Sequence, residues 1–265
     1  MSVTAKSSCS PRHCVALHGF TGCGDDFAAL AHHPELINIE WHCPDLPGHG
    51  VAAKIPVTPK NMLRAIDEAA RALPRAEEAE SPQRVLLGYS MGARAALLHA
   101  AMHPSAWDAL VLISGTAGLR DENERTERKS GDARLAAAME THGLEWFLTE
   151  WQNKPILHSQ QNIPKAIRNS LQAKRRCQSV SGLAASLRGF GTGTFPSLWN
   201  DLEAMKLPTL LITGVEDTKF TELSRRMQQV LPQATHLALP GLGHTPHLEH
   251  LNRFAPALRA WLDKQ

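Results

Sequence analysis

The sequence contains one serine in a setting that makes it a candidate nucleophile or base. Residues 85–92 read Val-Leu-Leu-Gly-Tyr-Ser-Met-Gly, an apolar run that ends in a Gly-x-Ser-x-Gly pentapeptide, and helix-forming residues follow. A serine on so sharp a strand-to-helix turn has strained backbone angles, and Gly88 and Gly92 leave room where side chains would collide. An ordinary Gly-Ser turn is the alternative, but the flanking strand and helix patterns favour a nucleophile elbow. Ser90 is therefore the predicted reactive residue.

A reactive serine needs a histidine base and an acid that orients the histidine. Behind a nucleophile elbow the chain order is serine, then Asp or Glu, then histidine. The loop after the penultimate apolar run contains Glu216 and Asp217, and the glycine-rich loop after the last run contains His244. We predict Asp217 as the acid and His244 as the base. Glu216 is the alternative acid, because either carboxylate could orient an imidazole, and His49 and His247 are rival histidines with expected surface or packing roles.

The first apolar run leads into a second motif of the candidate site, Leu-His-Gly-Phe-Thr-Gly. The loop after this strand supplies one backbone N–H of the oxyanion hole in such sites. We expect the N–H groups of Phe20 and Met91 to be the two donors. His18, in the same loop, is expected to hold the loop through hydrogen bonds, and Asp45, in the turn Asp-Leu-Pro-Gly-His-Gly, is expected to have a structural role.

The hydrophobic pattern predicts the scaffold that must position these residues. Short apolar runs alternate with helical patterns, which predicts an α/β fold with a mostly parallel sheet and helices on both faces. The predicted strands are 13–17, 37–43, 84–87, 109–113, 207–213 and 234–239, and the predicted helices are 25–33, 59–73, 91–103, 219–230 and 247–263. Open sheets of this kind bind ligands beyond the carboxyl ends of their strands, where the serine and acid loops fall.

The alternation breaks once, between Leu119 and Asn200. Charges crowd into residues 120–134, and helix-like segments with three tryptophans follow, namely Trp146, Trp151 and Trp199. A separate domain or a disordered charged linker is the alternative, but linkers rarely carry so much apolar mass. We interpret residues 119–200 as a helical cap inserted into a core of residues 1–118 and 201–265.

Composition bounds the class of protein and of partner. The chain has 265 residues, 43% of them hydrophobic, which is enough for one large domain or a domain with an insertion. The 28 Lys and Arg residues nearly balance the 26 Asp and Glu residues. No nucleic acid and no acidic membrane surface is therefore indicated as a partner.

Cysteine usage and the N-terminus bear on location. Five cysteines without metal-like spacing favour reduced thiols over disulfides. Residues 1–12 lack the apolar core of a signal peptide, and no later run reaches transmembrane length. We expect a cytoplasmic monomer or weak homo-oligomer. Because no His, Cys or carboxylate cluster has ligand spacing, we expect no metal and no cofactor.

Arginines near the candidate site narrow the substrate class. Arg94 lies one helical turn beyond Ser90, and a guanidinium fork there suits a carboxylate. The predicted cap adds further candidate cations, namely Arg125, Arg128, Arg175, Arg176 and Arg188. Any one of them alone is best interpreted as a solvated surface charge. Together they indicate a small anionic substrate.

Longer motifs carry a resemblance to a known family. They are Gly-Tyr-Ser-Met-Gly-Ala-Arg at 88–94, Glu-Arg at 127–128, the segment 182–193, Pro-Ser-Leu-Trp at 196–199 and the loops 217–220 and 243–249. Over nearly its whole length the chain resembles 2-succinyl-6-hydroxy-2,4-cyclohexadiene-1-carboxylate (SHCHC) synthase, the MenH family of the α/β-hydrolase superfamily. The whole superfamily shares Gly-x-Ser-x-Gly, whereas the flanking Tyr and Arg and the Ser-Leu-Trp signature are more selective. Ala93, where a glycine is common in the family, is a small departure that should leave the elbow intact.

The resemblance implies an α/β-hydrolase fold and a lyase of menaquinone (vitamin K2) biosynthesis. Such an enzyme eliminates pyruvate from 2-succinyl-5-enolpyruvyl-6-hydroxy-3-cyclohexene-1-carboxylate and gives SHCHC, with no acyl-enzyme and no cofactor. By this resemblance Ser90, activated by His244, removes a ring proton while the oxyanion hole holds the developing charge.

The resemblance also implies a set of substrate contacts. The substrate has three carboxylates, for which the family pattern indicates Arg94, Arg128 and either Arg175 or Arg176, with Tyr89 and Trp151 lining the pocket. A serine hydrolase, either an esterase or a carbon–carbon bond hydrolase, acting on a carboxylate-bearing substrate is the alternative function. A binding protein without activity is disfavoured because serine, acid and histidine are all present in order.

Overall fold

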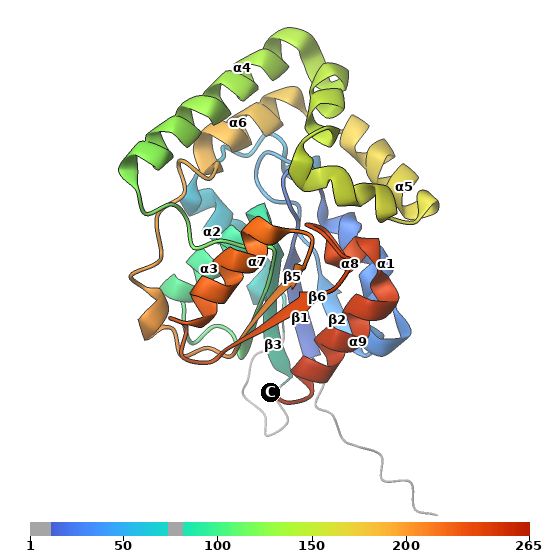
Figure 1. Cartoon of the computed structure of the whole chain (residues 1–265), viewed down its shortest axis with the longest axis vertical. Helices are drawn as coiled ribbons and strands as arrows, with labels where there is room; N and C mark the ends of the chain where they lie inside the picture. Colours follow the sequence, from blue (N-terminus) through green and yellow to red (C-terminus); the bar gives the residue numbers. More distant parts are fainter. Residues whose placement is uncertain (1–11, 74–81) are drawn as a thin grey trace, which may run out of the picture.

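A six-stranded parallel sheet forms the centre of the protein (Figure 1). The computed structural model describes residues 12–73 and 82–265. Residues 1–12, in which we expect no signal peptide, lie outside the described residues except for Arg12. The strand order is β2-β1-β3-β4-β5-β6. The strands are β1 (Arg12–Leu17), β2 (Ile39–His42), β3 (Gln83–Tyr89), β4 (Ala109–Ile113), β5 (Thr209–Gly214) and β6 (Ala234–Leu239). The predicted α/β class and parallel sheet are confirmed.

The strand boundaries differ from the predicted ones for local reasons. β2 begins two residues later than expected, and the side chain of Ile37 before it is 60% exposed. β5 begins after Pro208, whose nitrogen has no hydrogen to donate to a neighbouring strand. β3 runs on to Tyr89, which places Ser90 directly at its carboxyl end.

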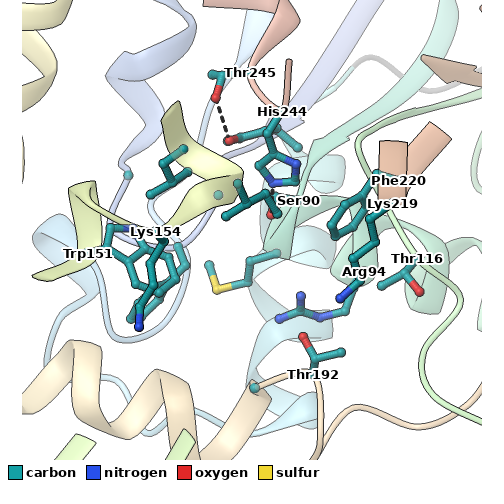
Figure 2. Close-up of a pocket in the computed structure, with 18 of the residues that line it drawn as sticks. Ser90, Arg94, Thr116, Trp151, Lys154, Thr192, Lys219, Phe220, His244 and Thr245 are labelled. Atoms are coloured by element: carbon teal, nitrogen blue, oxygen red, sulfur yellow. Dashed lines mark hydrogen bonds between the residues drawn. The ribbon is translucent and has the colours of Figure 1, made fainter. Parts of the chain in front are cut away.

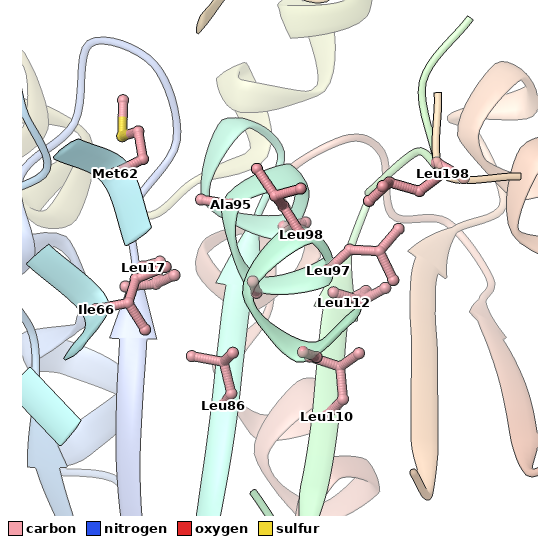
Figure 3. Close-up of a cluster of buried hydrophobic side chains, with 14 of the residues drawn as sticks. Leu17, Met62, Ile66, Leu86, Ala95, Leu97, Leu98, Leu110, Leu112 and Leu198 are labelled. Carbon is pink, nitrogen blue, oxygen red and sulfur yellow. The ribbon is translucent and has the colours of Figure 1, made fainter. Parts of the chain in front are cut away.

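Helices cover both faces of the sheet, and alternate strand residues face the two layers. Val15 and Leu86 pack against one layer, while Ala16 and Leu87 pack against the other. The first layer contains α2 (Pro59–Arg71), α3 (Met91–Met102) and α7 (Thr218–Gln228), and the second contains α1 (Ala28–Ala31), α8 (Pro246–Glu249) and α9 (Leu251–Leu262). Figure 3 shows leucines of α3 packed beside Leu110 and Leu112 of β4. This buried layer fixes α3, and with it the turn that carries Ser90.

Two predicted helices are subdivided in the structure. The predicted helix 25–33 begins as a 3-10 turn, Gly24–Phe27, before α1. The predicted helix 247–263 is broken between α8 and α9, because His250 has φ −153° and is extended. Other 3-10 turns are Pro34–Leu36, Gly50–Ala52 and Leu202–Ala204.

A helical insertion between β4 and β5 lies over one edge of the sheet (Figure 1). It consists of α4 (Glu122–Gln152), a 3-10 helix (Pro155–Asn162), α5 (Lys165–Arg176) and α6 (Val180–Phe190). We call these elements the cap. α4 bends at Gly143, whose φ of 84° is a conformation that favours glycine. Phe147 and Leu183 are buried in a small core shared by α4 and α6.

Trp199 departs from the expected helical setting. It follows α6 in a non-helical stretch and packs in the main core, with its Nε1–H donating to the carbonyl oxygen of Gly118 at 2.9 Å. The chain therefore returns to the core before residue 200.

Two further observations concern the length of the helices and the cysteines. None of the helices within residues 12–73 and 82–265 is long and apolar enough to cross a membrane. The four cysteines in those ranges, Cys14, Cys23, Cys43 and Cys177, are free thiols, and Cys9 lies outside them.

Candidate active site

Ser90 occupies a strained turn between β3 and α3. Its φ of 52° and ψ of −103° lie where residues other than glycine are rarely found. A Cβ atom on Gly88 would collide with the backbone of Gly92, and one on Gly92 would collide with the backbone of Leu17 and His18. The glycines on both sides of Ser90 therefore permit a close approach of three chain segments, which is the geometry of a nucleophile elbow.

His244 lies between Ser90 and Asp217, and Figure 2 shows its ring directed at Ser90. Its Nδ1 is 2.6 Å from Asp217 Oδ2, and its Nε2 is 3.1 Å from Ser90 Oγ. A carboxylate can only accept, so Nδ1–H donates to Asp217 and the Nε2 lone pair accepts the Ser90 hydroxyl proton. The structure therefore brings the three predicted residues into an array that can move a proton from serine to imidazole. Glu216, the alternative acid, is exposed and forms no such contact.

A buried carboxylate that the sequence analysis missed holds the His244 loop. Glu249, in α8, accepts hydrogen bonds from the N–H of Gly243 at 2.6 Å and the N–H of Thr245 at 3.0 Å. It therefore binds the backbone on both sides of His244. Ser159 of the cap donates its hydroxyl to the same carboxylate at 2.7 Å. The sequence signal for this residue is an acid five positions after the histidine. We infer that Glu249 positions His244 and ties the cap to its loop.

Replacing Glu249 with glutamine is expected to lower kcat by about 10- to 100-fold and to change KM less. The amide would turn an N–H₂ group toward backbone donors, and displacements of about 1 Å at a reacting group cost roughly this much. Steady-state kinetics on the wild type and the variant measure the split. Glu68→Gln on exposed α2 is the matched control. An unchanged kcat with a lowered melting temperature would assign Glu249 a purely structural role.

The predicted oxyanion donors lie beside Ser90, in the wall of a cavity between the cap and the core. Phe20 and Met91 both line the cavity. Neither backbone N–H donates to an acceptor within residues 12–73 and 82–265, so both remain available for a ligand oxygen. Met91 is the first residue of α3, where N–H groups lack partners inside the helix.

Hydrogen bonds fix the loops around this corner of the site. His18 Nδ1–H donates to the carbonyl oxygen of Gly19 at 2.8 Å, and His18 Nε2 accepts the N–H of Leu46 at 2.9 Å. Asp45 accepts two backbone N–H groups, each at 2.8 Å. Both side chains therefore hold loops together, in agreement with their expected structural roles.

A cavity of 1110 Å³ lies between the cap and the core. Among the residues predicted to bind substrate, Tyr89, Arg94, Arg128, Trp151 and Arg175 line it. Figure 2 shows Arg94 and Lys219 on one side of Ser90, and Lys154 beside Trp151 on the other. Lys154 and Lys219 were not predicted as site residues. The position of Lys219 in the acid loop, residues 217–220, could have identified it as a candidate site residue.

Three candidate arginines lie outside this cavity. Arg176 is exposed, and its Nε lies 3.4 Å from Glu145. The neighbouring Arg175 occupies the cavity wall instead, because successive residues of a helix point about 100° apart. Arg188 forms two hydrogen bonds to exposed Glu140, and Arg125 pairs with Glu122 on the surface of α4. Of the candidate cations in the cap, Arg128 and Arg175 therefore line the cavity, and these three do not.

Arg94 is the most deeply buried cation in the cavity wall. It is 9% exposed, and one Nη–H donates to the carbonyl oxygen of Phe190 at 2.9 Å. Burial, reinforced by the charge of Arg128, lowers its pKa to about 10, so it is protonated at neutral pH. Within the described residues its Nε has no hydrogen-bond partner and no carboxylate forms an ion pair with it. A buried charge without a counter-ion is costly, and a ligand carboxylate would supply one.

Arg175, in α5 of the cap, resembles Arg94 in this respect. One Nη–H donates to Gln160 Oε1 at 3.1 Å, and its Nε has no partner within the described residues. Burial lowers its pKa, with the charge of Asp26 acting against that shift. Arg128 differs, because it is 43% exposed and already pairs with Asp132 at 2.9 Å. Two of the three predicted arginines therefore lie in the cavity wall, Arg94 buried and Arg175 partly buried, each with an Nε–H that has no partner in the described residues.

Two histidines near the site predict that the protein loses stability in acid. Burial lowers the pKa of both His49 and His247 to about 3. In the unfolded chain histidine titrates near pH 6.5, so below this pH the unfolded state binds protons that the folded state does not. Stability is therefore full above pH 6.5 and falls as the pH falls.

On going from pH 7 to pH 5, each of these histidines is expected to lower the free energy of unfolding by about 2 kcal/mol. Urea unfolding at the two pH values measures the loss. His247→Gln should reduce the loss, and His142→Gln, on the exposed surface, should leave it unchanged. Equal losses in both variants would show that other groups cause the acid sensitivity.

Comparisons with known proteins agree with this geometry. Residues 14–257 match the Alpha/beta hydrolase family. The chain is 31% identical to the 2-succinyl-6-hydroxy-2,4-cyclohexadiene-1-carboxylate synthase of Photorhabdus laumondii, over 94% of this chain and 84% of that protein. It is 35% identical to a Bacillus subtilis protein that provisionally carries the same name, over 94% and 89% of the two chains. The solved structure of MenH from S. aureus matches with a TM-score of 0.84 and 27% identity, covering 97% of this chain and 96% of that one.

Proposed function

Because the chain belongs to the alpha/beta hydrolase family and, within it, to the SHCHC synthase (MenH) family, we propose that it is a lyase of menaquinone biosynthesis. It eliminates pyruvate from 2-succinyl-5-enolpyruvyl-6-hydroxy-3-cyclohexene-1-carboxylate and gives SHCHC. The observation that carries this proposal is that Arg94, which is buried, and Arg175, which is partly buried, line the same cavity as Ser90 and form no ion pair within the described residues. An enzyme for neutral esters gains nothing from two such charges, whereas a polycarboxylate supplies their counter-ions.

In the proposed reaction Ser90 acts as a base instead of forming an acyl-enzyme. His244 accepts the hydroxyl proton at Nε2 as Ser90 Oγ takes a proton from a ring carbon, and Asp217 stabilises the resulting imidazolium. The ring electron pair forms the new C=C bond while the C–O bond to the enolpyruvyl group breaks. The released enolpyruvate takes up a proton at carbon and becomes pyruvate, and loss of the imidazolium proton, to this product or to solvent, restores neutral His244.

Charge develops on the succinyl carbonyl during proton removal, and the N–H groups of Phe20 and Met91 are the proposed donors to it. Preorganised donors of this kind stabilise an enolate-like oxygen without rearranging in the transition state. Arg94, Arg128 and Arg175 are the proposed carboxylate contacts, and Tyr89 and Trp151 line the ring-binding region. The cap closes the cavity above them. We further propose that the cap, which lies within the predicted insertion 119–200, covers the site and that a monomer or weak homo-oligomer is the active species.

The test is a comparison of two activities of the purified protein. The enolpyruvyl precursor is supplied, and pyruvate release and diene absorbance are followed together, while a p-nitrophenyl ester is assayed in parallel. Efficient elimination with poor ester turnover is the expected result. Brisk ester cleavage without any diene would make the protein a serine hydrolase of the same fold.

A further inference from the structure

Three side chains with metal-binding atoms meet on the edge of the sheet, and none of them lines the cavity. They are His13 of β1 and Glu40 and His42 of β2. In the parallel register His13 lies opposite Glu40, and Val15 lies opposite His42. Alternate residues of a strand share a face, so all three side chains project from the same face of the sheet. Strand pairing, not sequence spacing, creates this cluster.

The distances within the cluster match those between the ligands of one small ion. Glu40 Oε2 is 3.2 Å from His13 Nδ1, and Glu40 Oε1 is 3.3 Å from His42 Nε2. A tetrahedral ion with bonds of about 2.0–2.1 Å separates neighbouring ligand atoms by roughly 3.3–3.4 Å. The three ligand atoms of the cluster all lie within 4.8 Å of one another. The two short distances end on different oxygens of Glu40, so small side-chain rotations are needed to bring one ion within reach of all three residues.

The histidine nitrogens that face Glu40 are otherwise unsatisfied. The side chain of His13 is 7% exposed, and its Nδ1 has no hydrogen-bond partner within the described residues. Nε2 of His42 is also buried and likewise has no hydrogen-bond partner within the described residues. Leaving a buried polar nitrogen without a partner destabilises the folded protein. An ion between the rings would satisfy both nitrogens at once.

We propose that His13, Glu40 and His42 bind a divalent transition-metal ion of the Zn²⁺ class. Neutral imidazole suits zinc, copper and nickel, and a carboxylate completes a two-histidine, one-carboxylate set that zinc readily accepts. Glu40 is 62% exposed, so water can fill the fourth position. With three protein ligands and an open side, the site binds the ion reversibly, with a Kd in the micromolar range.

The site has a structural consequence. β2 is an edge strand that pairs only with β1 among the described strands, and the ion would join the two. The chain leaves β2 toward the turn that contains Asp45 and His49, beside the cavity. Because none of the three ligands lines the cavity, metal binding stabilises the fold and leaves the chemistry at Ser90 essentially unchanged.

A second group of possible ligands, Asp67, His99 and His103, serves as a contrast. His99 Nε2 already lies 3.1 Å from Asp67 Oδ1, and His99 Nδ1 accepts the N–H of Trp107 at 3.0 Å. Both ring nitrogens are thus engaged, and the charge of nearby Arg84 disfavours a cation. This group supplies the matched control.

The experiment titrates tag-free, full-length protein with Zn²⁺ and follows heat release and the melting temperature. At about a hundredfold excess of free Zn²⁺ over Kd, we expect the melting temperature to rise by roughly 5–10 °C. His42→Ala and Glu40→Gln should abolish this rise, and His103→Ala should retain it. With Co²⁺ in place of Zn²⁺, the wild type should show the visible absorption of a tetrahedral site, and His42→Ala should not.

Binding at the active site is distinguished by His244→Ala, which should keep the full rise in melting temperature. The assignment is overturned if the rise disappears in His244→Ala but persists in His42→Ala, or if the wild type shows no binding below about 1 mM Zn²⁺. These readouts do not depend on the lyase activity. Failure of the metal site and failure of the proposed function are therefore separate results.

Discussion

Replacing Ser90 with alanine is expected to lower kcat for pyruvate elimination by about 10³- to 10⁴-fold, while KM changes little. A positioned general base contributes this order of rate, and among the described residues no other side chain hydrogen-bonds His244 Nε2 in place of the hydroxyl. Substrate binding should persist because the alanine leaves Arg94 and Arg175 in place. Pyruvate release and diene absorbance under saturating substrate measure the effect.

Ser114 offers a closely matched control for this substitution. It also has a positive φ, 48°, and directly follows the neighbouring strand β4. Its Oγ is buried without a partner in the described chain, and it does not line the cavity. Ser114→Ala should retain activity within a few fold. A Ser90→Ala variant that keeps more than a tenth of wild-type kcat would show that Ser90 is not the base.

Replacing Arg94 with glutamine is expected to lower kcat/KM by roughly 10²- to 10³-fold, which corresponds to about 3–4 kcal/mol. The reason is the loss of a buried cation whose proposed partner is a substrate carboxylate. Within the described residues no carboxylate pairs with this cation, so the same substitution should leave the melting temperature unchanged or raise it. Kinetics and thermal unfolding of the variant measure the two effects together.

Arg188→Gln provides the control for charge alone, because this exposed arginine pairs with Glu140 and does not line the cavity. It should leave both kcat/KM and the melting temperature close to those of the wild type. If Arg94→Gln unfolds the protein or leaves kcat/KM intact, Arg94 has a structural role and the carboxylate contact is wrong.

The sequence predicted those features that depend on local patterns. The nucleophile elbow at Ser90 and the loops of Asp217 and His244 follow strands that hydrophobic periodicity identifies. The parallel sheet then brings these loops to one edge, and the structure places the three side chains within hydrogen-bond distance. Strand and helix boundaries were less predictable, because they depend on single residues such as Pro208 and His250.

Features that depend on the phase of a helix or on strand register were not predictable. Arg175 and Arg176 are adjacent and chemically identical, and only the packing of α5 decides which of them faces the cavity. Glu249 acts through backbone N–H groups, so its spacing from His244 was the only sequence signal for its role. His13 meets Glu40 only through the pairing of β1 with β2, so no ligand spacing indicated the proposed metal site.

The central proposal is that Ser90 removes a ring proton and that no acyl-enzyme forms. A single-turnover reaction with substrate deuterated at that ring carbon tests it most directly, with pyruvate, diene and the intact mass of the protein followed over time. Proton removal by Ser90 predicts that deuterium slows pyruvate and diene formation equally, with no mass added to the protein. A covalent adduct on Ser90, with rates independent of deuterium, would contradict the proposal and indicate a hydrolase.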